Sequence, residues 1–321
     1  MKTTKFGRYE LLHRIGGGGM AEVFKARSSG FAGFEKIVAI KRIFPNLAEN
    51  EEFLAMFIAE AKLSANLTHG NIAQVYEFGQ VDESYFIAME YINGRDLGAI
   101  LRHYHGQRKT LPIPFSIYIV LSVLNALAYA HGRKDISEGN GVIHRDVSPP
   151  NILISLDGEV KLIDFGIAKA RDKGGESNLV GNIAYMSPEQ ATGEHLDSRS
   201  DLFAVGAILF ECVVGRALFT GPTDLAILEQ VRRAVVSPPT KVNPLVPKPL
   251  EAIILKAVAR DPGARFQSAL ELRAALARFV QSSRLTYNAK QLSRWMKTTF
   301  GAAPAGAEGP PVARLLLVPG Q

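Results

Sequence analysis

Cysteine is nearly absent from this 321-residue sequence, which contains a single thiol, Cys212. One cysteine excludes an intramolecular disulfide, so the chain is not a disulfide-stapled secreted scaffold. Cys212 lies inside an apolar run, and we interpret it as a small buried hydrophobic residue. A reducing compartment fits this pattern, and we expect a cytoplasmic protein.

Long hydrophobic runs are also missing. The two most apolar stretches, residues 117–130 and 203–214, are shorter than the ~18–20 apolar residues that a membrane-spanning helix needs. Residues 1–10 are charged and polar and lead into no apolar segment, unlike a signal peptide. We therefore expect no transmembrane segment, and we expect both apolar stretches to be buried helices of a large core.

The sequence has no surplus of acidic residues. Its 37 lysines and arginines outnumber 31 aspartates and glutamates, for a net charge of +6. Such a balance raises nucleic acid or an anionic membrane as a partner. The surplus is local, because residues 278–321 contain six basic residues and one acid, Glu308. No nucleic-acid motif accompanies it, so we expect no nucleic acid as partner.

The hydrophobic content of 47% predicts a folded chain, and its patterns divide it into two parts. Residues 9–43 and 72–91 are rich in Val, Ile, Phe and Tyr and predict antiparallel strands, with a helix over 50–67 between them. Helical patterns dominate from 96 to 280, apart from a strand-like insert at 142–163. The fold class is therefore α+β, with a small, mostly β N-terminal lobe (about 1–92) before a larger, mostly helical lobe (about 93–280).

Residues 281–300 predict an amphipathic helix, and the Gly/Ala/Pro-rich residues 301–321 predict a flexible tail. Asn288 is the candidate cap of this helix, which carries Leu292, Trp295, Met296 and Phe300 on one face. We favour packing of this face on the large lobe. The alternative is docking of the basic helix to anionic lipid or to a partner.

Two sequence motifs suit a phosphate ligand. Ile15 precedes Gly16-Gly17-Gly18-Gly19, and glycines let a backbone approach phosphate oxygens closely, although such a run is also an ordinary hairpin turn. In Val38-Ala39-Ile40-Lys41 the side chains alternate, so Ala39 and Lys41 share one face of a strand. Lys41 can neutralise phosphate charge, and Glu60 on the following helix is the candidate anion that holds it.

Two further motifs bring acids and an amide oxygen. Asp146 and Asn151 are five residues apart in His144-Arg145-Asp146-Val147-Ser148-Pro149-Pro150-Asn151, and Asp164-Phe165-Gly166 follows. Carboxylate and amide oxygens are the ligands that Mg²⁺ prefers. Each motif alone is also compatible with a turn, but chance does not explain all four in this order.

With these motifs the sequence resembles the bacterial members of the eukaryotic-like Ser/Thr protein kinases over residues 9–280. The resemblance extends to Met89-Glu90-Tyr91, Met186–Gln190, Ser200–Phe203 and Asp261–Phe266. It implies a bilobal kinase fold. It also implies a signalling enzyme that transfers the γ-phosphate of Mg·ATP to protein serine or threonine hydroxyls, including its own. Transfer to tyrosine is disfavoured by this resemblance alone.

The resemblance implies roles in nucleotide binding. Phosphate contacts are expected from the backbone of Gly16, Gly18 and Gly19, next to Ile15, and from Lys41 paired with Glu60. Adenine contacts are expected from the backbone of Glu90 and Ile92, with the side chains of Val23, Ala39 and Leu153 against the ring.

The resemblance also implies the catalytic roles. Asp146 would orient the acceptor hydroxyl and take its proton, and Asn151 and Asp164 would bind Mg²⁺. Asp201 would brace the catalytic loop, and Glu189 would pair with Arg265.

Three positions depart from the family pattern: Ala21, Ser148 and Asn182. Ala21 replaces a loop glycine at little cost. Ser148 stands where Ser/Thr kinases carry lysine and Asn182 where they carry threonine; losing such an electrostatic contact costs about 10²–10³ in rate. Either Ser148 and Asn182 form a compensating polar contact in an active enzyme, which we favour, or the chain is a pseudokinase scaffold that binds ATP with weak or no transfer.

Between Ile167 and Val180 the only hydroxyl belongs to Ser177. We hypothesise that Ser177 is a regulatory autophosphorylation site that would engage Arg145. The alternative is an exposed loop serine without a role.

Overall fold

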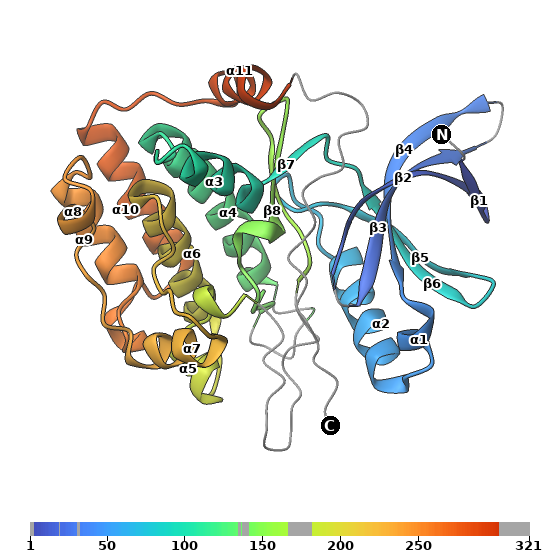
Figure 1. The fold of residues 1–321 in the computed structure, drawn as a ribbon, viewed down its shortest axis with the longest axis horizontal. Helices are drawn as coiled ribbons and strands as arrows, with labels where there is room; N and C mark the ends of the chain where they lie inside the picture. Colours follow the sequence, from blue (N-terminus) through green and yellow to red (C-terminus); the bar gives the residue numbers. More distant parts are fainter. Residues whose placement is uncertain are drawn as a thin grey trace. The chain divides into compact units, whose positions relative to one another are not determined.

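The computed structural model describes residues 3–18, 20–30, 33–133, 136, 141–165 and 182–301. They form two compact units. Unit 1 contains the described residues up to 68, residues 73–92 and residues 300–301, whereas unit 2 contains residues 69–72 and 93–299. Unit 1 is built on a curled sheet and unit 2 is mostly helical (Figure 1), which confirms the predicted α+β class.

Unit 1 is a six-stranded antiparallel sheet in the order β1-β2-β3-β4-β6-β5. Its strands are β1 (Thr4–Phe6), β2 (Tyr9–Gly17), β3 (Ala21–Ser29), β4 (Glu35–Ile43), β5 (Val75–Val81) and β6 (Ser84–Glu90). Helices α1 (Pro45–Ala48) and α2 (Glu51–Ala65) connect β4 to β5. The side chain of Asn50 caps α2 by accepting from the backbone N–H groups of Glu52 and Phe53.

Strand β4 separates two hydrophobic clusters of this sheet. Ile40 belongs to a cluster with Phe6, Tyr9 and Phe86, whereas Ile43 packs with Phe57 of α2. Side chains alternate along a strand, so the residue after Ile40 lies on the α2 face together with Ile43. That residue is Lys41.

Unit 2 combines a three-stranded sheet, in the order β7-β8-β9, with most of the helices. The strands are β7 (Gly94–Asp96), β8 (Ile152–Ser155) and β9 (Val160–Leu162). The helices are α3 (Leu97–Gly106), α4 (Ile113–Gly132), α5 (Pro188–Thr192), α6 (Ser198–Val214), α7 (Asp224–Arg233), α8 (Pro239–Val242), α9 (Lys248–Ala257), α10 (Ala269–Ser282) and α11 (Ala289–Phe300).

Helix α6 is the centre of unit 2, and every residue from Ser200 to Val214 is buried. Gly206 permits close packing against the end of α9, because a Cβ there would lie 2.8 Å from the Cβ of Ala257. Cys212 is fully buried, as expected, and this burial raises the pKa of its thiol.

Helix α4 packs against α6 and α10. It has 20 residues, so it is longer than the apolar stretch at 117–130 that we selected from the sequence. Among the described residues it is the one helix long and apolar enough to cross a membrane. However, 56% of its most apolar 18-residue stretch is buried inside the protein. Residues such as Ile117, Leu124 and Leu127 are fully buried, as a core helix requires.

Helix α11 begins at Ala289 rather than at the predicted residue 281, since α10 continues to Ser282. Asn288 caps it as expected, with its side chain accepting from the N–H of Gln291 at 2.9 Å. Leu292 and Met296 are completely buried, and the indole N–H of Trp295 donates to the hydroxyl of Tyr104 in α3 at 2.8 Å. The expected packing of α11 on the helical part is therefore confirmed. Residues 302–321, most of the predicted tail, lie outside the described residues.

A buried ion pair joins α5 to the segment before α10. Arg265 Nη1 and Nη2 donate to the Glu189 carboxylate at 2.7 and 2.8 Å, and the side chain of Arg265 has no exposed surface. Burial by itself raises the pKa of Glu189, but the hydrogen bonds and charge of Arg265 outweigh it and hold this pKa below its usual 4.5.

Removing Arg265 should destabilise the fold. Arg265→Ala leaves the Glu189 charge buried and should lower the free energy of unfolding by about 3–5 kcal/mol, measured by urea denaturation. Lys256→Ala, which breaks a half-exposed pair with Glu271, should cost less than about 1 kcal/mol. Because the folded-state pKa of Glu189 is depressed, the pair's contribution is present above pH 4.5 and is lost as the pH falls through that pKa. Equal losses in both variants would contradict this assignment.

Candidate functional site

The glycine-rich turn joins β2 to β3, and the Gly18 N–H closes it by donating to Ala21 O at 2.9 Å. Nothing inside the described part of the protein requires glycine at two of these positions. A Cβ on Gly18 would meet no atom within 4 Å, and one on Gly16 would make only an ordinary contact with Val23 at 3.9 Å. Ile15 beside them is 43% exposed. Open space beside a backbone without side chains suits a ligand that approaches that backbone. Gly19 lies outside the described residues.

The pairing of Lys41 with Glu60 is present in unit 1. Lys41 Nζ donates to Glu60 Oε1 at 2.6 Å, and each side chain is 15% exposed. The pair forms because Lys41 lies on the face of β4 that α2 covers. On this face, Phe57 and Ala61 of α2 are buried in one hydrophobic cluster with Ile43 of β4. This contact holds the ammonium group in one position, where it can meet an anionic ligand.

Two apolar candidates lie on the same face as Lys41. Val23 is its direct partner across the β3–β4 ladder, and Ala39 precedes it by two residues on β4. At the end of β6, the N–H of Glu90 donates to Gln74 O at 2.8 Å, so a purine base could not use that N–H. Ile92, the other expected hinge residue, follows two residues later at the end of unit 1.

In unit 2, the loop before Asp146 is held by the carboxylate of Asp201 at the start of α6. This carboxylate accepts from the N–H of His144 at 2.9 Å and of Arg145 at 2.8 Å, and it binds His131 Nε2 at 2.7 Å. Burial by itself raises the pKa of Asp201, but the hydrogen bond and charge of His131 prevail and hold this pKa below 3.8. Arg145 adopts the left-handed backbone conformation, with φ of 66°. The hydrogen bonds to Asp201 stabilise this unfavourable backbone conformation of Arg145.

His144 links this loop to the segment that carries Asp164. Its Nδ1 accepts from the N–H of Asp146 at 3.2 Å, and its Nε2 lies 3.0 Å from Ile163 O. Because a carbonyl oxygen can only accept, Nε2 carries the proton and the ring is neutral. Complete burial lowers the pKa of His144, in agreement with this neutral state. A neutral His144 therefore bridges Asp146 and Ile163.

Asp146 and Asn151 are in direct contact. The Asn151 Nδ2 group donates to the backbone oxygen of Asp146 at 2.9 Å and to its carboxylate at 2.8 Å. Asn151 thus turns its amide nitrogen to Asp146, and its amide oxygen is the end that suits a cation. The N–H of Ile163, next to Asp164, donates to Asn151 O at 3.0 Å. The donor types and this connection fit magnesium held by Asn151 and Asp164.

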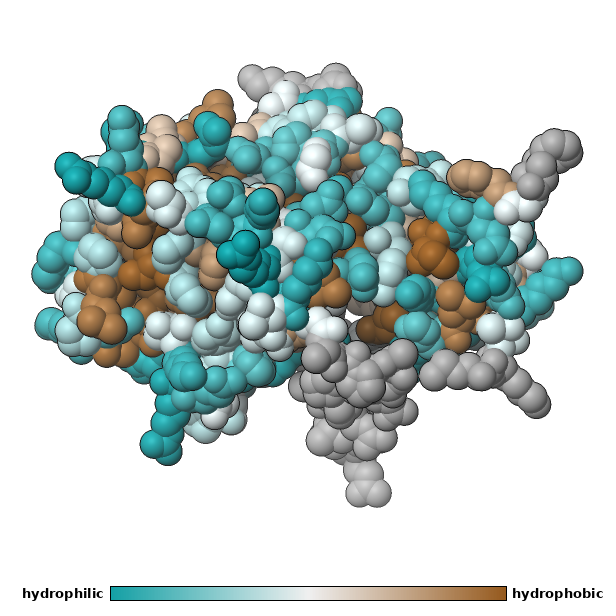
Figure 2. All heavy atoms as spheres, turned by 90° about the horizontal axis from the view of Figure 1, so that it is seen from above, coloured by the Kyte–Doolittle hydropathy of each residue, from teal (hydrophilic) through white to brown (hydrophobic). Residues whose placement is uncertain are grey.

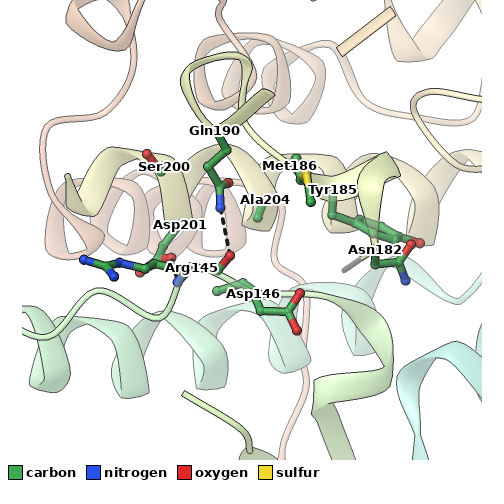
Figure 3. A pocket seen from close by; sticks show the side chains of 10 residues that line it. Arg145, Asp146, Asn182, Tyr185, Met186, Gln190, Ser200, Asp201 and Ala204 are labelled. Carbon is green, nitrogen blue, oxygen red and sulfur yellow. Dashed lines mark hydrogen bonds between the residues drawn. The ribbon is translucent and has the colours of Figure 1, made fainter. Parts of the chain in front are cut away.

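A small pocket lies beside Asp146 (Figure 3). Its lining includes Val147, Asn182, Tyr185, Met186 and Ala204. Gln190 of α5 reaches across it and donates from Nε2 to Arg145 O at 2.8 Å, the contact drawn as a dashed line. The pocket therefore offers a mixed polar and apolar surface next to the carboxylate.

The comparisons with known proteins decide the family. Residues 9–296 match the protein kinase domain family. The chain belongs to the protein kinase family. The kinase is 38% identical to Tyrosine-protein kinase MasK of Myxococcus xanthus, over 92% of this chain and 46% of that protein. It is 36% identical to Serine/threonine-protein kinase PrkC of Bacillus subtilis, over 87% of this chain and 41% of that protein.

Solved structures agree with this family. The crystal structure of the Mycobacterium tuberculosis PknI kinase domain has a TM-score of 0.62 and 27% sequence identity, covering 86% of this chain and 97% of that one. The chain spans less than half the length of the two curated relatives.

The described part of the structure does not contain a compensating contact between Ser148 and Asn182, which was one of the two alternatives for these residues. Both lie within the described residues, but no hydrogen bond joins them: Ser148 is buried beside Asn151, whereas Asn182 is exposed at the edge of the pocket. The two side chains end in different environments, since one belongs to the loop after Asp146 and the other to the segment before α5.

Sequence reasoning missed two residues of the site, His131 and Gln190. His131 is at the end of α4, 70 residues before Asp201, and no spacing rule connects them. The sequence contains a local pattern that points to one of the two contacts of Gln190. The pattern Ser187-Pro188-Glu189-Gln190 is a capping box, and the structure contains it. Its second contact, to Arg145 O, depends on tertiary packing.

The Lys41–Glu60 contact makes a testable claim about ligand affinity. Glu60→Gln keeps the shape of the side chain but removes its charge, and should weaken Mg·ATP binding about tenfold in calorimetry. Glu22→Gln is the matched control, because Glu22 pairs with Arg42 on the opposite face of the same sheet at 2.5 Å. Its affinity should stay within about twofold of the wild type. Equal affinities in the two variants would overturn the role of Glu60.

Proposed function

We propose that this kinase transfers the γ-phosphate of Mg·ATP to serine or threonine hydroxyls of proteins, including its own. The observation that carries the proposal is the contact of Asp146 with Asn151, in a loop that His144 and Ile163 connect to Asp164. One loop thus combines an acceptor for a hydroxyl proton with oxygens for magnesium. Relatives named as serine/threonine-protein kinases support it.

The proposed nucleotide contacts are the residues that the family resemblance assigns. In unit 1, the backbone of Gly16, Gly18 and Gly19 beside Ile15 would contact the phosphates, and Lys41 would neutralise them while Glu60 holds it. The base would contact the backbone of Glu90 and Ile92, with the side chains of Val23, Ala39 and Leu153 against the ring. Asn151 and Asp164 would hold Mg²⁺, which supplies positive charge at the phosphates when bound.

Catalysis would rest on positioning. Phosphoryl transfer has a loose transition state, so the protein mainly orients the groups and neutralises charge. Asp146 would orient the acceptor hydroxyl and take its proton. The Asn151 side chain holds the Asp146 carboxylate by donating a hydrogen bond to it. Asp201 and His144 hold the loop in this conformation.

The decisive experiment is transfer from labelled ATP to the kinase itself and to three peptides that differ only in Ser, Thr or Tyr at one position. The wild type should label serine or threonine. Asp146→Asn should transfer about 10²–10⁴-fold more slowly, because it removes the proton acceptor, while binding Mg·ATP normally. Unchanged turnover in this variant would overturn the role of Asp146. Wild-type binding of Mg·ATP without any transfer would instead identify an ATP-binding scaffold.

A second candidate acceptor is tyrosine. The Myxococcus relative, which aligns with 92% of this chain, is named a tyrosine-protein kinase. The position two residues after Asp146 is the buried Ser148, so the lysine that Ser/Thr kinases carry there is replaced. In the peptide assay, label on the tyrosine peptide alone would favour this candidate over the first.

We also propose that Ser177 is an autophosphorylation site. Ser177 lies outside the described residues, but Arg145 is described, and its Nε is buried without a hydrogen-bond partner among them. A phosphate is a suitable partner for this guanidinium group. After incubation with ATP, mass spectrometry should find phosphate on Ser177 in the wild type and not in Asp146→Asn. Absence of phosphate from wild-type Ser177 would reject the site.

We place this activity in the cytoplasm, where ATP and protein substrates are available, in signal transduction. Docking to a partner or membrane through α11 would use its exposed Lys290 and Arg294, because Leu292 and Met296 are already buried within the protein. From the side on which α11 lies in Figure 1, the surface is a mixture of hydrophilic and hydrophobic residues (Figure 2).

A further inference from the structure

Helix α11 is attached to the turn between β8 and β9. Ser293 Oγ donates to Leu156 O at 2.8 Å, and Lys297 Nζ binds Asp157 Oδ1 at 2.8 Å. Gly158 has φ of 84°, and a Cβ there would lie 2.1 Å from Ala289 O. The backbones of the turn and the helix therefore meet with no room for a side chain between them. Figure 1 shows α11 beside the end of β8.

The opposite contacts of α11 anchor it to the rest of unit 2. Leu292 and Met296 are fully buried, and the Trp295 ring packs against Phe115 of α4 with ring centroids 5.0 Å apart. Trp295 also donates to the Tyr104 hydroxyl. The helix is thus a fixed support on α3 and α4, and it contacts the β8–β9 turn from that support.

The β8–β9 hairpin connects this turn directly to the magnesium residues. Asn151 immediately precedes β8, and Asp164 follows β9 by two residues. The two strands pair in register from Ile152–Leu162 to Ile154–Val160, and Ile163 N–H closes the base of the hairpin on Asn151 O. A short paired hairpin transmits a displacement of its turn to its base, because its hydrogen bonds keep the strands together.

We propose that Ser293 is a positioning residue for magnesium binding: through its bond to Leu156, α11 sets the position of the hairpin and thereby of Asn151 and Asp164. The inference rests on the proposed function, since it takes these two residues as the magnesium site. It gives α11, which takes no part in the catalytic steps proposed above, a role at the magnesium site.

Coupling between two sites is reciprocal, so occupancy of the magnesium site must also strengthen the docking of α11. Trp295 is the only tryptophan in the chain, and its ring lies in the docking contact. Its fluorescence therefore reports docking without any label. In the wild type, adding a non-hydrolysable ATP analogue with Mg²⁺ should reduce quenching of Trp295 by acrylamide, whereas the analogue without Mg²⁺ should not.

The matched variants are Ser293→Ala and Thr298→Ala. Each removes one hydroxyl from α11, but the Thr298 hydroxyl donates to Arg294 O of the same helix and does not reach the hairpin. Ser293→Ala should raise the Mg²⁺ concentration needed for half-maximal binding of the analogue by about fivefold, while its Mg²⁺-free affinity is unchanged. Thr298→Ala should leave both values unchanged. A purely structural role for Ser293 would lower the melting temperature without this dependence on Mg²⁺.

Gly158→Ala tests the same coupling from the hairpin side, since the added methyl group displaces the turn from Ala289. It should raise the Mg²⁺ midpoint at least as much as Ser293→Ala. Mg²⁺ midpoints equal to the wild type in both variants, with the analogue bound, would overturn the inference and leave the proposed function intact. A wild type that fails to bind the analogue with Mg²⁺ would overturn both.

Discussion

The buried carboxylate of Asp201 is the interaction on which the geometry of the catalytic loop depends. It accepts two consecutive backbone N–H groups, those of His144 and Arg145, and is itself held by His131. A buried carboxylate is costly unless its oxygens are fully hydrogen-bonded, and these donors supply that requirement. These hydrogen bonds hold the backbone of Arg145 in the left-handed conformation, directly before Asp146.

From this brace, contacts extend in two directions. The neutral imidazole of His144 connects the loop to Ile163, which precedes Asp164. One ring nitrogen accepts from the N–H of Asp146 and the other donates to Ile163 O. Gln190 connects the same loop, at Arg145 O, to α5, whose Glu189 is bound by the buried Arg265. The loop is therefore hydrogen-bonded to α6, α5 and the segment after β9, so a displacement of any of them would shift the position of Asp146.

Unit 1 holds the ammonium group of Lys41 on one face of its sheet. The alternation of β4 places Ile40 in one hydrophobic cluster and Ile43 in the other, so that Lys41 faces α2 and Glu60. The neighbouring Arg42 faces the opposite side, over the rings of Phe6 and Phe24 and bound to Glu22. Two adjacent basic residues thus acquire different environments from strand periodicity alone.

The sequence by itself determined the family, the α+β class and the local elements. Strand alternation placed Lys41 and Ala39 on one face, Asn288 marked the start of α11, and the motif order identified Asp146, Asn151 and Asp164 as candidates. These inferences succeed because they depend on periodicity, capping and short spacing, which are local properties. Tertiary structure alone decided the contacts between distant segments. His131 meets Asp201 across 70 residues, and Ser293 meets Leu156 across 137. It also separated Ser148 from Asn182, because the partner of a polar side chain depends on which segments pack together, and that is set by the whole core.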